Sequence, residues 1–151
     1  MRSELINQNV RADFKLARNL PSVTGDLVQL QQVLLNLVVN ACDAMADCDR
    51  SERRLLIRTG IENEITAVIV SVTDRGHGIP EEEKARVFEP FFTTKAKGMG
   101  LGLSVCRTII AAHRGELWAT NNADCGATFH FTLPIAASDK EPVITNNGLA
   151  Q

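Results

Sequence analysis

The sequence contains no apolar run long enough to cross a membrane. About 20 consecutive apolar residues are needed to span a bilayer, and the longest run here, residues 33–46, is interrupted by Asn36, Asn40 and Asp43. A signal-peptide pattern is also missing, because the first residues of the chain are largely polar. We therefore expect a cytoplasmic location and no membrane contact by this domain.

The sequence also lacks an excess of charge of either sign. Its 16 basic and 18 acidic residues give a net charge of −2 and are spread along the chain. Binding to nucleic acid through charge requires a concentrated positive patch. We therefore expect no nucleic acid among the partners.

Cysteine pairs with the spacing of a metal site are absent. None of the four cysteines forms a Cys-x-x-Cys pair, and the three histidines do not cluster with them. This spacing argues against a zinc site. We interpret Cys42 and Cys106 as small core residues of a protein from a reducing compartment.

The hydrophobic pattern predicts an α/β fold, in which helices cover one face of a mainly antiparallel sheet. A chain of 151 residues suits a single domain. We assign residues 1–9 to a linker or the stub of a helix, 10–134 to the domain, and 135–151 to a disordered tail. The expected strands are 10–18, 54–60, 65–73, 116–120 and 127–133, and the expected helices are 27–45, 81–87 and 101–113.

Three polar residues lie on one face of the long predicted helix that begins after the N-cap Asp26. Asn36, Asn40 and Asp43 are spaced three or four residues apart. Asparagine is a poor helix former and is costly to bury without partners. The two asparagines could bond to neighbouring loops, or could form a polar wall at which an amide oxygen ligates Mg²⁺. Asp43 could join that face or remain a solvated charge.

A first glycine-rich turn follows a predicted strand. Asp74 ends the strand, and Gly76 and Gly78 follow at alternate positions. Glycine allows a tight turn or a close approach of the backbone to a ligand. The carboxylate could accept a hydrogen bond from an exocyclic amino group, or could simply cap the turn.

A second glycine-rich segment, residues 98–102, precedes a predicted helix. Backbone N–H groups at a helix N-terminus can surround an anion. The spacing matches neither the dinucleotide fingerprint nor the P-loop. Before it, residues 94–100 have little to bury and could move over a ligand. Lys95 could bring positive charge to phosphates there, or could be solvated.

Five segments in this order resemble the catalytic, ATP-binding domain of bacterial two-component sensor histidine kinases. They resemble the family's N box, first glycine box, F box, second glycine box and G-[TA]-x-F element, and they are residues 36–41, 74–80, 88–95, 98–104 and 126–129. The resemblance runs from about residue 10 to residue 134, and it is closest to the nitrogen- and oxygen-sensing branch. It implies the Bergerat fold of the gyrase, MutL and heat-shock-chaperone ATPases, an α/β (α+β) two-layer sandwich with a mixed, mainly antiparallel sheet and helices on one face. It also implies ATP and Mg²⁺ as cofactors.

The resemblance also implies roles at the base of the nucleotide. Asp74 would accept a hydrogen bond from the adenine amino group, and Thr128 would support it directly or through water. Gly76, Gly78 and Ile79 would let the chain pass close to the base.

Other roles are implied at the phosphates. Asn40 would ligate Mg²⁺, with Asn36 and Asp43 on the same helix face. The residues that would face the phosphates, in and after the segment that could move, are Lys95, Gly98, Gly100, Leu101 and Gly102. The ATPase relatives have a glutamate as general base where this chain has Asn36, which cannot take a proton. The chain is therefore suited to holding ATP for transfer to another group, with slow hydrolysis.

An acceptor histidine is missing. His77, His113 and His130 are not followed by glutamate, as the family's phosphorylated histidine usually is. We therefore expect a monomeric catalytic domain that phosphorylates a histidine on a separate dimerisation domain, with a response regulator downstream. It could be the cytoplasmic part of a membrane-bound sensor. The alternatives are a serine kinase of the anti-sigma type and a nucleotide-binding module without chemistry.

Overall fold

The structure is a computed structural model that describes residues 2–62, 66–92 and 102–136. Five strands form one sheet in the order β1-β2-β3-β5-β4. The strands are β1 (Arg11–Lys15), β2 (Arg54–Glu62), β3 (Ala67–Thr73), β4 (Leu117–Asn121) and β5 (Ala127–Pro134). The β1–β2 pair is parallel, and the three other pairs of neighbours in this sheet are antiparallel.

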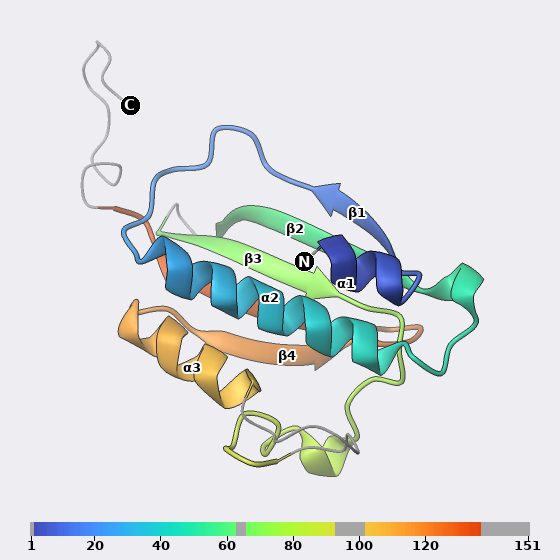
Figure 1. Ribbon diagram of the computed structural model, residues 1–151. Coiled ribbons are helices and arrows are strands. Elements are labelled where there is room, and N and C mark those ends of the chain that lie inside the picture. The colour runs from blue at the N-terminus through green and yellow to red at the C-terminus, as the bar shows by residue number, and fades with distance from the viewer. Residues whose placement is uncertain (1, 63–65, 93–101, 137–151) are drawn as a thin grey trace.

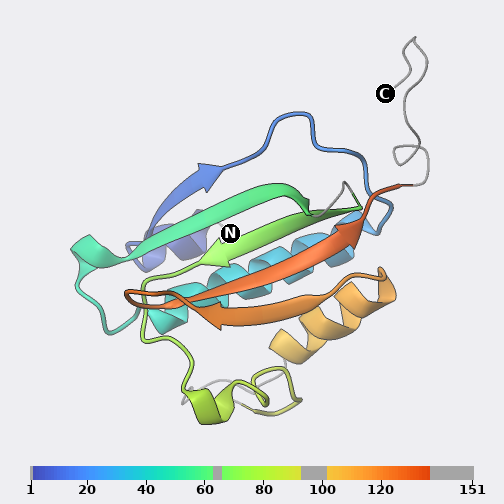
Figure 2. The ribbon, with the colours of Figure 1, turned by 180° about the vertical axis from the view of Figure 1, so that it is seen from behind.

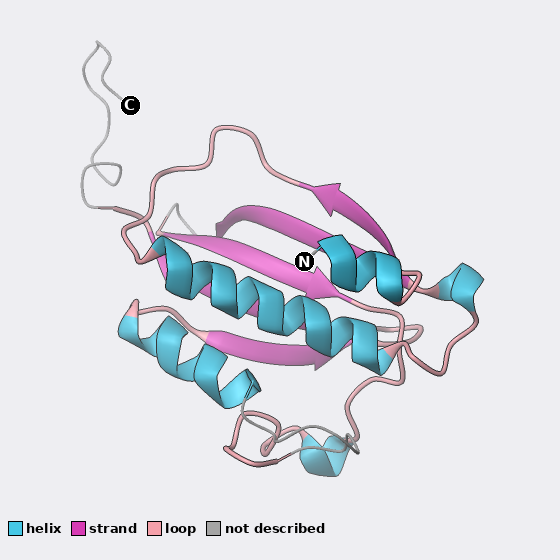
Figure 3. Ribbon diagram, in the orientation of Figure 1, coloured by secondary structure: helices cyan, strands magenta, loops and turns pink. Residues whose placement is uncertain are grey.

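Three α-helices cover one face of this sheet, as Figures 1 and 3 show. They are α1 (Arg2–Asn7), α2 (Leu27–Ala44) and α3 (Gly102–Ala112). Seen from behind, in Figure 2, the strands lie in front of the helices. The predicted two-layer sandwich is therefore confirmed. None of the helices in the described ranges is long and apolar enough to cross a membrane.

Helix α2 is the central element of the helical layer. It begins after Asp26, whose carboxylate accepts a hydrogen bond from the backbone N–H of Gln29 at 3.1 Å, as the predicted N-cap should. One face packs onto the sheet and the other elements through buried apolar residues at helical spacing. These are Val33, Leu37, Val38, Ala41 and Cys42.

The core lies between the helices and the inward-facing side chains of the strands. Leu55, Val72 and Phe129 are among the strand residues that it buries. Cys42 and Cys106 are both fully buried, as expected of small core residues. Burial raises the pKa of the Cys106 thiol to about 11, so this thiol is not a nucleophile at neutral pH.

The predicted helix at 81–87 was wrong. The structure has a 3₁₀ turn, η2 (Glu81–Glu83), followed by further turns. The segment contributes little apolar surface, with Val87 as its buried residue. One buried residue cannot offset the cost of nucleating an α-helix.

The predicted first strand is shorter than expected. Residues 10–18 were predicted, and β1 covers Arg11–Lys15. Phe14 and Leu16 are 57% and 58% exposed, because β1 is the edge strand and has a neighbour on one side only. At the start of the chain, residues 2–7 form α1, and Val10 joins the buried core.

Candidate functional site

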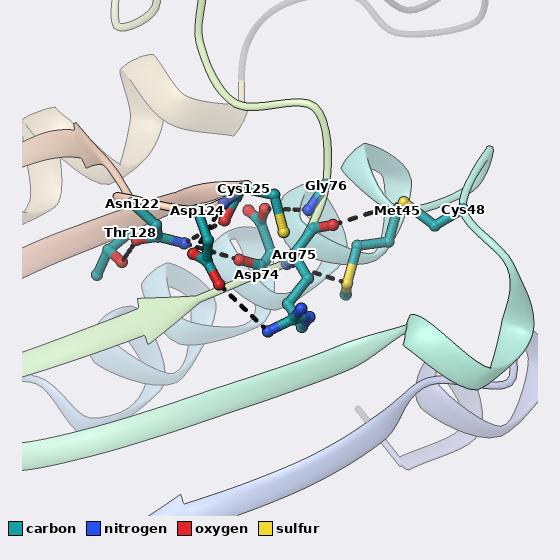
Figure 4. A network of polar contacts seen from close by, with 9 residues as sticks. All are labelled: Met45, Cys48, Asp74, Arg75, Gly76, Asn122, Asp124, Cys125 and Thr128. Carbon is teal, nitrogen blue, oxygen red and sulfur yellow. Dashed lines mark hydrogen bonds and ion pairs between the residues drawn. The ribbon is translucent and has the colours of Figure 1, made fainter.

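Asp74 is buried, with 1% of its surface exposed, and among the described residues it is the charged side chain that is buried in this way. It comes directly after β3 and lies beside the turn between β4 and β5 (Figure 4). Its Oδ1 accepts hydrogen bonds from the backbone N–H of Gly76 at 2.8 Å and of Ala127 at 3.1 Å. Within the described ranges we find no hydrogen bond to Oδ2. One oxygen is thus fixed by the backbone, and the other can accept a bond from a ligand.

Burial and hydrogen bonding act on Asp74 in opposite directions. Burial raises the pKa of this carboxyl above its usual range, and the N–H groups of Gly76 and Ala127 lower the pKa to a smaller extent. The backbone pairs therefore favour the ionised form, which offers only acceptors. An amino group is the complementary ligand.

The first glycine box folds tightly against the end of α2. A Cβ atom on Gly76 would lie 2.3 Å from the carbonyl oxygen of Ala44, which only glycine can avoid. Gly78 has a φ of 78°, in the left-handed region that favours glycine. Both glycines are thus required for the path of the chain after Asp74.

Two asparagines at the end of β4, which the sequence analysis missed, hold this path in place. Asn121 accepts a hydrogen bond from the Ile79 N–H at 2.8 Å and donates one to the Ile79 carbonyl at 2.9 Å. Asn122 donates to the carbonyl of Asp74 at 2.9 Å. The available signal was an Asn-Asn pair directly before a predicted turn, a position where asparagine bonds to nearby backbone.

The hydrogen bonds of the Thr128 side chain in the described part of the chain go to side chains other than Asp74. Its hydroxyl donates to Asn122 at 2.6 Å and shares a hydrogen bond with Thr73 at 2.9 Å. Because side chains alternate along a strand, Thr73 and Thr128 point away from the helices, while the neighbouring Phe129 enters the core. Among the described residues, Asn122 links Thr128 to the carbonyl of Asp74, and the N–H of Ala127 contacts the carboxylate.

The three polar residues on α2 have different surroundings. Asn36 accepts a hydrogen bond from Gln32 at 2.8 Å and donates one to the carbonyl of Gly102 at 3.3 Å. Asn40 is half-buried, and we find no partner for its amide among the described residues. Asp43 accepts a hydrogen bond from Gln8 at 3.5 Å, so it faces the N-terminal segment.

Helix α2 contacts both glycine boxes. Gly102, the first residue of α3, is bonded to Asn36, and Gly76 packs against Ala44. Asn40 lies midway between these contacts. Asn36 and Ala44 are eight positions apart, which corresponds to about 12 Å of helix.

The other predicted residues of the phosphate end lie outside the described residues. They are Lys95, Gly98, Gly100 and Leu101. The F box is described only as far as Phe92. Its Phe88 packs edge-on against Phe129, with ring centres 6.0 Å apart, which anchors this end of the box to the core.

A metal site built from protein carboxylates or thiols is not found in the described ranges, which contain no cluster of three or more His, Cys, Asp or Glu side chains. A cation here would depend on the amide oxygen of Asn40, on the ligand's own oxygens and on water. That arrangement is typical of Mg²⁺ bound with a nucleotide.

Comparison with known proteins identifies the architecture. The family described as histidine kinase-, DNA gyrase B- and HSP90-like ATPases matches residues 25–137. The chain belongs to this family. It is 47% identical to the sensor protein FixL of Bradyrhizobium diazoefficiens over 129 residues, which are 85% of this chain and 25% of FixL. The chain thus spans about a quarter of the length of that relative.

Solved structures agree with this assignment. The nucleotide-free catalytic domain of the histidine kinase ThkA is 38% identical, with a TM-score of 0.75, covering 89% of this chain and 84% of that one. ThkA in complex with the response regulator TrrA also matches, at 35% identity and a TM-score of 0.72, covering 89% of this chain and 37% of that one. The predicted histidine kinase catalytic domain is confirmed.

Proposed function

We propose that this chain binds Mg·ATP and supplies the γ-phosphoryl group for phosphorylation of a histidine on a separate dimerisation domain. The observation that carries the proposal is the alignment along α2. Asn36 contacts the second glycine box, Ala44 contacts the first, and Asn40, whose amide has no partner among the described residues, lies between them. This arrangement can hold a base and a triphosphate at opposite ends.

At the base end, the Oδ2 of Asp74 accepts a hydrogen bond from the adenine amino group. Gly76 and Gly78 set the path of the chain beside the ring, because each packs closely against its neighbours. Ile79, which packs partly against the core, supplies an apolar side. Asn121 and Asn122 are positioning residues here, since each bonds to the backbone that carries these groups.

At the phosphate end, Asn40 would hold Mg²⁺. The N-terminus of α3 would face the phosphates. The other residues proposed to face the phosphates are Lys95, Gly98, Gly100, Leu101 and Gly102. When bound, Mg²⁺ neutralises charge on the phosphate oxygens. Asn36 activates no water, because it is not a base and both ends of its amide are already hydrogen-bonded. The site therefore positions the γ-phosphoryl group and favours transfer over hydrolysis.

The partners follow from this chemistry. The acceptor histidine lies on a dimerisation domain, and the phosphoryl group then passes to a response regulator. The related kinase ThkA has been solved in complex with such a regulator, TrrA. We place the reaction in the cytoplasm, where ATP is available, and we expect no nucleic acid or membrane at this surface.

The test combines binding and transfer. Calorimetry with ATP, with and without Mg²⁺, should show metal-sensitive binding. The chain mixed with a dimerisation domain that carries the family's His-Glu motif should then form an acid-labile phosphohistidine. Acid-stable phosphoserine on a protein substrate would instead support the anti-sigma type of kinase. ATP binding without transfer to any acceptor would support a non-catalytic module.

A further inference from the structure

Two cysteines that the nucleotide site does not use lie on either side of its Asp74–Gly76 segment. Cys48 follows the end of α2, and its thiol contacts the carbonyl oxygen of Arg75 at 3.5 Å. Cys125 lies in the turn between β4 and β5. Both are partly buried free thiols, in contrast to the fully buried Cys42 and Cys106.

The turn that carries Cys125 is fastened to the same segment. Asn122 donates hydrogen bonds to the carbonyl oxygens of Asp74 and Cys125, both at 2.9 Å. Next to it, a Cβ atom on Gly126 would lie 2.8 Å from the Cα of Arg75. Arg75 also forms an ion pair with Asp124 at 3.7 Å. Cys125 is therefore held beside the residue that the thiol of Cys48 contacts.

Figure 4 shows the two thiols on either side of the Arg75 backbone. They are near enough for a charge on Cys125 to raise the pKa of Cys48, an effect second only to burial. Each cysteine lies in a loop, between α2 and η1 for Cys48 and between β4 and β5 for Cys125. Loops can move to bring two thiols to the geometry that a disulfide requires.

We propose that Cys48 and Cys125 form a redox-sensitive pair, which a peroxide oxidises to an intramolecular disulfide across Arg75. This site is independent of the proposed kinase activity. In a reducing compartment such a bond would be transient and regulatory rather than structural.

The chemistry divides between the two thiols. The raised pKa of Cys48, caused first by burial, makes its thiol a slow nucleophile at neutral pH. We therefore assign the first step to Cys125, whose thiolate attacks a peroxide oxygen. With hydrogen peroxide the O–O bond breaks, the leaving hydroxide takes up the proton that the Cys125 thiol released and departs as water, and Cys125 becomes a sulfenic acid. The sulfur of Cys48 then attacks that of Cys125, and its proton leaves with the hydroxyl as a second water. Two electrons pass from the thiols to the peroxide.

The direct test is a disulfide map. The reduced chain is treated with hydrogen peroxide, its remaining thiols are alkylated, and it is digested without reduction. Cleavage before aspartate separates Cys42 from Cys48, because Asp43 and Asp47 lie between them. Mass spectrometry should find the Cys48 and Cys125 peptides joined, with the loss of two hydrogens. A bridge to Cys42 or Cys106, bridges only between chains, or oxidised but unlinked thiols would overturn the proposal.

Single variants test the order of the steps. Cys48→Ser should remove the cross-link and leave a sulfenic acid on Cys125, which a dimedone probe labels. Cys125→Ser should also remove the cross-link but give much less labelling of Cys48. Cys106→Ala is the matched control, because it removes a buried thiol and should leave the cross-link unchanged. Equal or greater labelling of Cys48 in Cys125→Ser would contradict the assigned first step.

A second readout does not depend on mass spectrometry. Because a cross-link limits the unfolded chain, the oxidised wild type should unfold at a higher temperature than the reduced form. Neither Cys48→Ser nor Cys125→Ser should show this shift after the same treatment. If peroxide lowers the midpoint of all three proteins equally, the oxidation is damage and no bridge has formed.

Discussion

The two carboxylate oxygens of Asp74 have different partners, and this difference underlies its predicted specificity for an amino group. Two backbone N–H groups occupy Oδ1, so that Oδ2 is left for the ligand. In Asp74→Asn, the amide oxygen can replace Oδ1, and the NH₂ group must then face the adenine amino group. Loss of a charge-assisted hydrogen bond should cost roughly 1.5–3 kcal/mol. Calorimetry should show ATP affinity reduced by about ten- to a hundredfold.

The matched control for that change is Asp124→Asn, which removes an exposed carboxylate of the same network. Exposed ion pairs contribute little, so ATP affinity should stay near that of the wild type. Unchanged affinity in Asp74→Asn itself, with the fold intact by circular dichroism, would remove Asp74 from the nucleotide site.

The two asparagines of the N box should separate ligand binding from stability. Asn36→Ala removes hydrogen bonds to Gln32 and Gly102 and should lower the free energy of unfolding by about 1 kcal/mol. Asn40→Ala removes no bond among the described residues. It should leave stability within about 0.5 kcal/mol and weaken Mg²⁺-dependent ATP binding. Urea unfolding and calorimetry measure the two effects, and equal destabilisation by both changes would argue against a ligand role for Asn40.

The surroundings of His130 predict that the stability of the fold depends on pH. On the uncovered face of the sheet its ring stacks on Trp118, with centres 5.0 Å apart, and shares hydrogen bonds with Ser71 and Thr120 at 3.0 and 3.1 Å. Burial lowers the pKa of His130 below 6.5. The folded state thus favours the neutral ring, and the resulting stability is present above 6.5 and is lost as pH falls through the lowered pKa.

Urea unfolding of the wild type and of His130→Gln, at about pH 7.5 and about pH 5.5, measures this contribution. On acidification between these two pH values the wild type should lose more stability than the variant, by up to about 1.4 kcal/mol. An equal loss in both proteins would assign the effect to other groups.

At the scale of elements, contact between the first glycine box and α2 restricts which residue can follow Arg75. In Gly76→Ala, the new Cβ would meet the Ala44 carbonyl oxygen at 2.3 Å. Backbone must shift to relieve this contact, which should cost about 1–3 kcal/mol. Since Asp74 is two residues away, ATP affinity should fall as well. Thermal unfolding and calorimetry are the measurements.

Gly60→Ala is the control for that prediction. Gly60 lies within β2, and its new Cβ would meet Ile69 at 3.8 Å, an ordinary contact. Stability should be unchanged or rise by up to about 1 kcal/mol. If both alanine variants are equally stable, the packing of Gly76 against α2 does not constrain the chain.

Most elements could be predicted because their patterns are local. The helical spacing after Asp26 predicted α2, and alternation in residues 127–133 predicted β5. The turns at 81–87 could not be predicted from a local pattern. Three glutamates favour a helix start, but the lack of buried apolar residues decides against an α-helix. Alternation along one strand does not show which residues of another strand lie on the same face. The shared face of Thr128 and Thr73 follows only from the pairing of β3 with β5. For the same reason Ala127 could not be recognised as the partner of Asp74.

At the scale of the whole molecule, bound nucleotide should stabilise the domain. The proposed ligand contacts α2, α3 and the segment after β3 together, so it binds only the folded state. ATP at a hundred times its dissociation constant should add about 2.7 kcal/mol to the free energy of unfolding. Thermal scans with Mg·ATP should show a higher midpoint for the wild type and a smaller shift for Asp74→Asn. A shift of equal size in both proteins would place the ligand elsewhere.

The strand order also has a consequence during synthesis. Asp74 gains its bond from Ala127, which lies 53 residues later in the chain, and β3 has no second neighbour until β5 exists. A ribosome adds about 5–20 residues per second, so this interval lasts about 3–10 s. Throughout it, Asp74 lacks one of the two backbone bonds that fix its Oδ1, and one edge of β3 has no partner strand. The proposed nucleotide site can therefore be complete, and ATP can stabilise the domain through it, only after β5 has emerged.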